Sequence, residues 1–378
     1  MSKIRHSIGI KKVICLKRSL AGGHGPLLLD KLAQLPTSAT RRGKTGSCAA
    51  PQRGAQQLAP TNSPPTGRPT ATKETLKKRA RSKYYTALVV NELLKLDTPL
   101  WEYYARTRQC CSWVKQEGSK LTSSYCNSRV CHICNRIRTG KAINGYMGQV
   151  KDWVDQGNQI YFLTLTQGPT VPADRLGQTI NGMIKTFAKI NRVLRERRGI
   201  PINGIRKLEC TYNPRENLYH PHFHVLMDKG ADEFMAEWLK RYPNACPWSQ
   251  DIRIADSNSL KELFKYSTKI IDTYKSENPE ENPENKEVNI EIYPEALDNI
   301  MRALYGRRIL QPFGNIKKVN DEVEELQSQE YLDIPYHIEA VWFWTGQDWY
   351  TDQHPEGLTG YTPPPILQFT PLFYPLRE

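Results

Sequence analysis

Three of the eight histidines in this sequence lie close together, at His220, His222 and His224. Side chains alternate along a β-strand, so three residues at this spacing project from the same face. Two imidazoles about 7 Å apart along that face can bind one metal ion. The pattern therefore predicts a metal site on a strand; the alternative is a surface strand that happens to be rich in histidine.

A carboxylate joins these histidines if their strand forms a hairpin with the segment before it. Turn-forming residues between 213 and 217 separate two apolar runs. Pairing Tyr212 with Tyr219 then places Glu209 opposite His222. Two imidazoles and a carboxylate leave coordination positions open, which is typical of a catalytic rather than a structural site. Either Mg²⁺ or Mn²⁺ suits such a set.

A second group of reactive side chains lies on a predicted helix. Glu262 and Tyr266 are four residues apart and are therefore neighbours on its surface, with Lys265 and Lys269 beside them. A tyrosine next to a carboxylate in a basic setting can act as a nucleophile beside a base. Two alternatives stay open, because Ser259 and Glu262 also fit a capping box and Tyr266 could be an ordinary half-buried tyrosine.

Five of the nine cysteines lie between Cys110 and Cys134. Without any sign of secretion, such clustering is typical of metal binding rather than of disulfides. The alternative is a set of reduced, buried thiols.

The elements that must position these side chains follow a regular order. Periodicity and turn residues predict strands at 160–166, 202–212, 219–227 and 251–255, and helices at 174–198, 232–242 and 259–273. The order is β-α-β-β-α-β with one further helix, which is the split βαβ pattern. The expected fold class is therefore α+β, an antiparallel sheet with helices on one face and the other face open for a substrate.

Charge and composition divide the rest of the chain. The first 85 residues hold 18 Lys and Arg against Asp30 and Glu74, while the whole chain carries a net charge of +14. Such an arm suits a polyanion; the alternatives are a solubilising tail or an organelle-targeting leader. We predict four parts: a disordered basic arm and linker at 1–75, a helical and Cys-rich segment at 76–145, a catalytic domain at 146–320, and a C-terminal extension of unassigned role at 321–378.

Membrane and export signals are not expected. The sequence contains no apolar run of about 18 residues, and its first residues lack the long apolar stretch of a secretory signal. A cytoplasmic protein that does not contact membranes is therefore predicted.

Three motifs, taken together, resemble those of HUH endonucleases, and specifically the single-tyrosine replication initiators of small rolling-circle plasmids. They are FLTLT at 162–166, HPHFHVL at 220–226 and Glu-x-x-x-Tyr at 262–266, in that order. The resemblance runs from about Arg106 to Lys317, and HPHFHVL is its most specific part. It implies an HUH palm-like sheet for the catalytic domain.

The resemblance implies a role for each matching residue of the metal site. His222 and His224 would be the paired metal ligands. Glu209 matches the acidic third ligand by its position on the preceding strand, and His220 is the competing candidate.

The same resemblance implies the chemistry of the helix motif. Tyr266 would attack one DNA strand, leaving a 5′-phosphotyrosine and a free 3′ hydroxyl that primes a host polymerase. Glu262 would activate water in a termination step. Apart from the resemblance, a phenol has an ordinary pKa near 10, so Lys265 and Lys269 are candidates to help deprotonate Tyr266 or simply to contact phosphate. The implied partners are origin DNA, single-stranded at the nick in an extruded hairpin, and a host helicase and DNA polymerase.

Four cysteines resemble the Cys-rich motif of that family, namely Cys110, Cys126, Cys131 and Cys134. Cys110 is preferred to Cys111 because the family has a cysteine three residues before a tryptophan, here Trp113. Four thiolates in two clusters would form a structural zinc site, in which His132 could replace one ligand. Arg136 and Arg138 follow the motif and are expected to contact DNA.

Other functions remain open. A transposase or relaxase would share the chemistry, but related transposases have two tyrosines three residues apart, and the next tyrosine after Tyr266 is Tyr274. The sequence also lacks the Gly-x4-Gly-Lys-Ser/Thr helicase signature of the larger relaxases. A zinc-dependent hydrolase would use His222 and His224 without any tyrosine. A non-catalytic zinc module would bind nucleic acid without cutting it.

Overall fold

The computed structural model of the chain describes residues 70–71, 73–117, 120–264, 272–274, 289–291, 293–320, 330–332, 340–352 and 354–363. These residues fall within one compact unit, residues 38–378. Most of the predicted basic arm lies outside the described residues, and so do Lys265, Tyr266 and Lys269. Within the described residues, no helix has the length and apolar character needed to cross a membrane.

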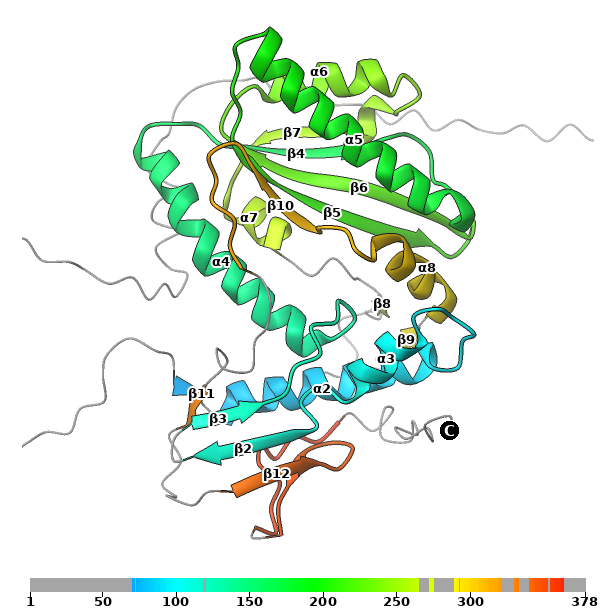
Figure 1. The fold of residues 1–378 in the computed structure, drawn as a ribbon, viewed down its shortest axis with the longest axis vertical. Coiled ribbons are helices and arrows are strands. Elements are labelled where there is room, and N and C mark those ends of the chain that lie inside the picture. The colour runs from blue at the N-terminus through cyan, green and yellow to red at the C-terminus, as the bar shows by residue number, and fades with distance from the viewer. Residues whose placement is uncertain are drawn as a thin grey trace, which may run out of the picture. The chain divides into compact units, whose positions relative to one another are not determined.

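Five strands form the main sheet, in the order β10-β5-β6-β4-β7 (Figure 1). They are β4 (Tyr161–Thr166), β5 (Gly204–Asn213), β6 (Leu218–Met227), β7 (Asp251–Ile254) and β10 (Leu310–Phe313). Every neighbouring pair is antiparallel. The predicted α+β class with an antiparallel sheet is therefore confirmed.

Three helices cover one face of this sheet, namely α5 (Ala173–Arg197), α6 (Ala231–Arg241) and α8 (Pro294–Leu304). On α5 the buried residues recur every three or four positions, as at Leu176, Ile180 and Met183. They share one core with alternate strand residues such as Leu165 and Phe223. Each fully buried side chain of this size contributes about 1.5–3 kcal/mol, so this core fixes the side of the sheet that faces the helices.

The opposite face carries α7 (Ser257–Phe264). It contacts α4 (His132–Asp155), because Thr139 donates to the carbonyl oxygen of Phe264 at 3.2 Å and the ring of Tyr146 stacks on that of Phe264. One helix therefore lies on the side that the sequence analysis left entirely to the substrate.

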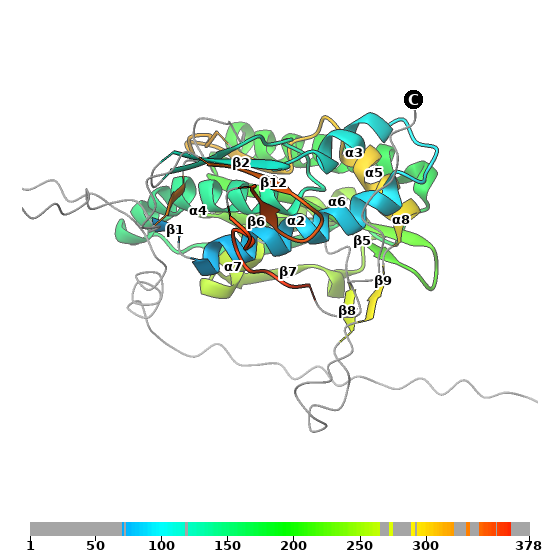
Figure 2. The same ribbon diagram turned by 90° about the horizontal axis from the view of Figure 1, so that it is seen from below.

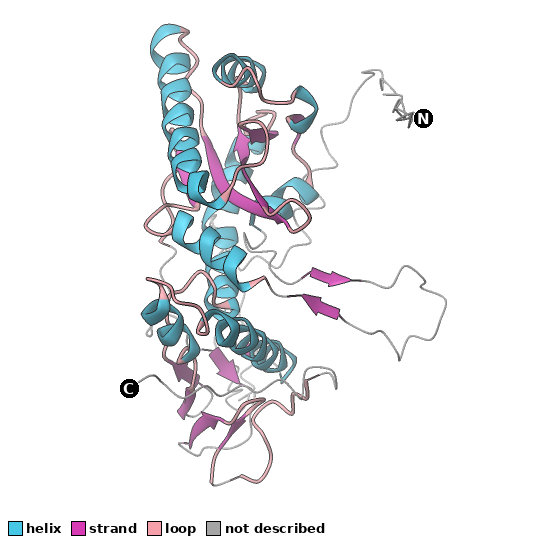
Figure 3. Ribbon diagram, turned by 90° about the vertical axis from the view of Figure 1, so that its right-hand side faces the viewer, coloured by secondary structure: helices cyan, strands magenta, loops and turns pink. Residues whose placement is uncertain are grey.

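The predicted bounds of α7 are wrong at both ends. Asp256 begins the helix, since its Oδ1 accepts from the backbone nitrogen of Ser259 at 2.7 Å and from its hydroxyl at 2.8 Å. The capping-box interpretation of Ser259 and Glu262 therefore fails, because Asp256 occupies the cap. Farther along, β8 (Asp272–Tyr274) pairs with β9 (Asn289–Glu291), and Figure 3 shows this two-stranded ribbon.

A second sheet joins segments that are far apart in the sequence. Its order is β1-β11-β3-β2-β12-β13, with β2 and β12 side by side (Figure 2). Its strands are β1 (Thr70–Ala71), β2 (Trp113–Glu117), β3 (Lys120–Ser123), β11 (Glu330–Leu332), β12 (Ala340–Trp344) and β13 (Trp349–Tyr350). The C-terminal extension thus shares a sheet with the Cys-rich segment.

The buried face of the second sheet packs on a helix near the start of the described chain. Val114, Trp342 and Trp349 form a core with Leu76 and Ala80 of α2 (Lys73–Leu93). The helix α3 (Trp101–Arg108) follows and leads to the first cysteines. Cysteines of the Cys-rich segment, among them Cys110 and Cys134, pack in the same core.

At Gly204, residues of both β6 and β10 lie close to the backbone of β5. A Cβ at this position would lie 2.2 Å from the carbonyl oxygen of Leu226 and 2.3 Å from a ring carbon of Phe313. Because the Leu226 oxygen belongs to the sheet backbone, it cannot move aside. We expect Gly204→Ala to lower the free energy of unfolding by about 1–3 kcal/mol, measured by urea denaturation.

The control for this prediction is Gly182→Ala. Gly182 lies inside α5 with nothing within 4 Å of a new Cβ. Alanine there should raise stability by about 0.5–1 kcal/mol through helix propensity. Equal effects of the two substitutions would contradict the close approach at Gly204.

Candidate metal centres

The hairpin of β5 and β6 brings a carboxylate next to two histidines. Tyr212 pairs with Tyr219, and the same register pairs Glu209 with His222, as the sequence predicted. Oε2 of Glu209 lies 3.3 Å from Nε2 of His222 and 3.4 Å from Nε2 of His224. All three ligand atoms lie within 4.8 Å of one another, and all three residues are buried. This group could hold a metal ion.

The other ring nitrogens of both histidines are held by neighbouring residues. Nδ1 of His222 lies 3.1 Å from the carbonyl oxygen of His220. A carbonyl can only accept, so this Nδ1 donates to it and the ring orientation of His222 is fixed. Nδ1 of His224 lies 3.3 Å from the hydroxyl of Thr164, and its ring stacks on Phe162. Both Nε2 atoms are therefore turned toward Glu209.

His220 does not join this group. Its ring stacks on that of His222 with centroids 5.5 Å apart, and its carbonyl oxygen orients the same ring. Burial lowers the pKa of His220. The structure brings His222, His224 and Glu209 together and leaves the competing candidate beside them.

Lys207 is a part of the site that the sequence analysis missed. Its ammonium forms an ion pair with Oε1 of Glu209, and its side chain is only 3% exposed. Burial raises the pKa of Glu209, but hydrogen bonds from His222 and His224 and the charge of Lys207 lower it well below its usual range. Lys207 stands two residues before Glu209 on the same strand, so alternation could have placed both on one face.

Glu262 lies at the edge of the same group. Its Oε1 is 3.9 Å from Nε2 of His224, and its backbone oxygen accepts a hydrogen bond of 3.0 Å from the Lys207 ammonium. Lys207 therefore ties α7 to the carboxylate of β5. The predicted nucleophile Tyr266 and its lysine neighbours lie outside the described residues.

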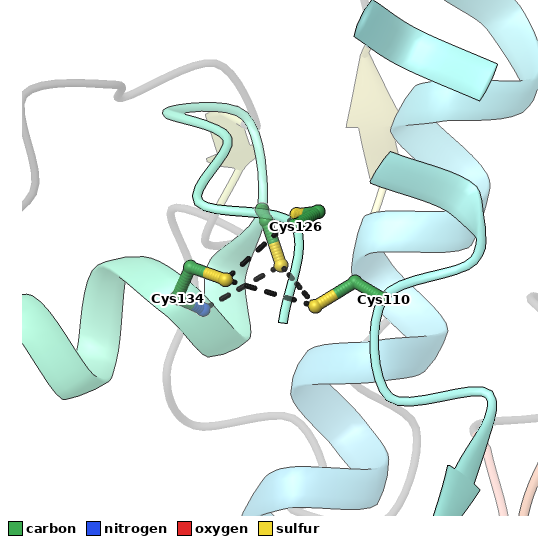
Figure 4. A group of neighbouring side chains, drawn as sticks. Cys110, Cys126 and Cys134 are labelled. Atoms are coloured by element: carbon green, nitrogen blue, oxygen red, sulfur yellow. Dashed lines mark hydrogen bonds between the residues drawn. The ribbon is translucent and has the colours of Figure 1, made fainter. Parts of the chain in front are cut away.

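Four thiols form a second group, consisting of Cys110, Cys126, Cys131 and Cys134. Cys110 follows α3, while Cys131 and Cys134 lie at the start of α4. The sulfur of Cys134 is 3.6 Å from that of Cys110 and 3.8 Å from that of Cys126, and these three thiols point toward one another in Figure 4. Cys131 lies 3.5 Å from Cys110. This group too could hold a metal ion.

The two competing ligands of the cysteine segment lie outside this group. Cys111 accepts a hydrogen bond of 3.1 Å from the hydroxyl of Ser123 instead. Burial lowers the pKa of His132 to about 4. The buried ammonium of Lys83 donates to the carbonyl oxygens of Arg108 and Cys110, which brings a positive charge next to the thiols.

The two arginines that follow the motif make contacts within the protein. Arg138 is buried, and its guanidinium donates to the carbonyl oxygens of Ser128 and Asn127 in the loop between the cysteines. Arg136 is exposed and donates to the carbonyl oxygen of Lys78 on α2 at 2.8 Å. Their predicted contact with DNA stays a prediction.

The fold and the two centres define an α+β protein with a carboxylate and two imidazoles on one face of an antiparallel sheet and four clustered thiols. The family described as "Replication protein" matches residues 119–250. That span includes Glu209 and both histidines of the first centre, but it ends before Glu262.

Two similar proteins of known sequence are also named as replication proteins. A "Protein rep" of Staphylococcus aureus is 32% identical over 173 residues, covering 41% of this chain and 73% of the relative. A "Protein rep" of Streptococcus pneumoniae serotype 2 (strain D39 / NCTC 7466) is 27% identical over 267 residues, covering 62% of this chain and 79% of the relative. No solved structure matches the chain. The chain belongs to the replication protein family, which confirms its resemblance to rolling-circle replication initiators.

The ion pair of Lys207 and Glu209 can be tested on the metal-free protein. Lys207→Met leaves a buried carboxylate without its cation, and Glu209→Gln leaves a buried cation without its anion. Each should lower the free energy of unfolding by about 3–5 kcal/mol at neutral pH. The double variant removes both charges, so it should lose less than the sum of the single losses.

Urea denaturation measures all four proteins of this cycle. Because the folded-state pKa of Glu209 is depressed, the contribution of its charge is present above the ordinary carboxyl pKa and is lost only as pH falls through the depressed value. Additive losses at neutral pH would show that the two charges do not interact.

Proposed function

We propose that this chain initiates rolling-circle replication by cutting one DNA strand at an origin through Tyr266. The observation that supports this is the position of Glu262. Its Oε1 lies 3.9 Å from Nε2 of His224, which belongs to the group of Glu209, His222 and His224. Tyr266 follows Glu262 by four residues, so covalent geometry keeps their Cα atoms within about 14 Å. The proposed nucleophile thus follows, in the sequence, a helix that contributes Glu262 to this group.

The donor set suits a divalent ion. Ligand atoms bound at about 2.1 Å and at right angles to one another lie about 3.0 Å apart. The separations of 3.3 and 3.4 Å from Glu209 to the two imidazoles are close to that value. Glu209, His222 and His224 would hold Mg²⁺ or Mn²⁺, which when bound stabilises negative charge on the scissile phosphate.

The chain's own residues would carry out the exchange of bonds. The phenol oxygen of Tyr266 attacks phosphorus in line, a tyrosine–phosphate bond forms, and the bond from phosphorus to the 3′ oxygen breaks. The phenol gives up its proton and the departing 3′ oxygen takes one up, so a free 3′ hydroxyl remains. Lys265 and Lys269 would contact the phosphate. In termination, Glu262 would take a proton from the water that hydrolyses the phosphotyrosine.

For the thiol group we infer a structural zinc ion. A tetrahedron with zinc–sulfur bonds of about 2.3 Å places its sulfurs about 3.8 Å apart. The measured separations of 3.5, 3.6 and 3.8 Å agree with this spacing. The ammonium of Lys83 beside Cys110 would offset part of the negative charge of four thiolates.

The zinc inference makes a direct prediction. Cys131→Ser should abolish stoichiometric zinc binding and lower the melting temperature, because three thiolates no longer close the tetrahedron. Cys111→Ser is the matched control, since Cys111 is equally buried but bonds to Ser123. Atomic emission measures zinc per chain; loss of zinc in the control alone would overturn the ligand assignment.

The cutting reaction is tested on supercoiled plasmid carrying the chain's own origin, with Mn²⁺ added. The unchanged chain should yield nicked circles with protein linked to a 5′ end. Tyr266→Phe should lower this rate by on the order of 10³-fold or more, because no other hydroxyl replaces the nucleophile. Tyr274→Phe is the control and should nick normally. Equal nicking by Tyr266→Phe would favour a metal-dependent hydrolase instead.

Glu262→Ala separates the two steps of the reaction. This variant should still nick, while the covalent protein–DNA product accumulates because water is no longer activated. A denaturing gel of labelled DNA measures the two products. Complete loss of nicking in this variant would contradict the termination role of Glu262.

A further inference from the structure

The second sheet carries a row of aromatic side chains that the proposed cutting reaction does not use. Phe343 of β12 pairs with Trp113 of β2 on one side and with Tyr350 of β13 on the other. Directly paired residues of antiparallel strands project from the same face. The three rings therefore lie in one row across three neighbouring strands, about 4.8 Å apart from strand to strand.

This row lies on the face that does not pack on the core. The alternate residues Val114 and Trp342 are buried, whereas Phe343 is 59% exposed and Val341 is 39% exposed. Lys115 pairs with Val341 and with Thr122, so a cationic side chain belongs to the same face. The outer face of the second sheet thus combines one exposed ring, Phe343, and two partly exposed rings with a lysine.

We propose that the row formed by Trp113, Phe343 and Tyr350 binds unpaired bases of single-stranded DNA. Aromatic side chains on the open face of a sheet stack on successive bases, and stacking tolerates any sequence because every base has a π-face. Phosphates between the bases carry the negative charge that Lys115 attracts.

A second copy of the chain or another protein fits this face less well. Such a partner would need a contiguous apolar patch of several hundred Å². Here Lys115 and Thr122 lie beside the aromatic row. The composition therefore favours a ligand with flat rings and negative charges.

This inference rests on the proposed function for the identity of the ligand as DNA, but it does not depend on cutting. It also gives a role to the aromatic C-terminal strands that the sequence left unassigned. A sheet that holds an unpaired strand would keep that strand available while the origin hairpin is opened and closed.

The test is equilibrium binding of the full chain to a fluorescein-labelled oligo-dT of about 20 nucleotides, without added divalent ion. A duplex of the same length is measured in parallel, at several salt concentrations. Phe343→Leu keeps an apolar side chain but removes the ring, so it should weaken single-strand binding by on the order of 10-fold. Duplex binding and the salt slope should not change, because phosphate contacts determine them.

Two variants control this result. Phe343→Tyr keeps a ring and should bind the single strand like the unchanged chain. Tyr305→Leu removes another exposed aromatic side chain, 61% exposed after α8, and should leave binding unchanged. Zinc content and melting temperature are compared for all variants to show that the fold is intact.

Each outcome decides the inference. Unchanged single-strand binding by Phe343→Leu would overturn it, as would an equal loss for duplex and single strand. A change in oligomeric state with unchanged DNA binding would show a surface for a second copy instead. Failure of the unchanged chain to bind either DNA would count against the proposed function itself, whereas normal nicking by Tyr266→Phe would overturn only the cutting mechanism.

Discussion

The pairing of Tyr212 with Tyr219 decides whether Glu209 lies on the same side of the main sheet as His222 and His224. Side chains alternate along both strands, so a slip of one residue in either strand would separate Glu209 from the histidine face and turn it toward α5. The core of Leu208 and Phe223 opposes such a slip, because their burial under the helices would be lost with it. Burial of the apolar side chains of β5 and β6 thus fixes the register that places Glu209 opposite His222.

Within that frame, Lys207 connects the sheet to the helix that approaches it. A buried ammonium is costly unless it is paired, and here Glu209 and the carbonyl oxygen of Glu262 both accept from it. The position of α7 is therefore coupled to the charge of the carboxylate. That coupling holds Glu262 close to His224.

Local patterns predicted the central part of this fold, and long-range contacts explain what they missed. The hairpin register followed from turn residues and apolar alternation near Glu209. Lys115, in contrast, pairs with Val341 across more than two hundred residues, and no local period reports such a contact. The short strand β10 contains Pro312, which weakens any strand signal. The cap at Asp256 was missed because Ser259 offers an equally good local pattern.

The two sheets use alternation in the same way but for different chemistry. In each, one face is committed to a core and the other carries groups that a soluble surface rarely gathers: imidazoles beside a carboxylate on β5 and β6, and aromatic rings beside a lysine on β2 and β12. In both sheets, burial of the first face stabilises the strands that carry the second. Because the thiol group lies in the core of the second sheet, metal binding there would stabilise the aromatic row as well as the helices behind it.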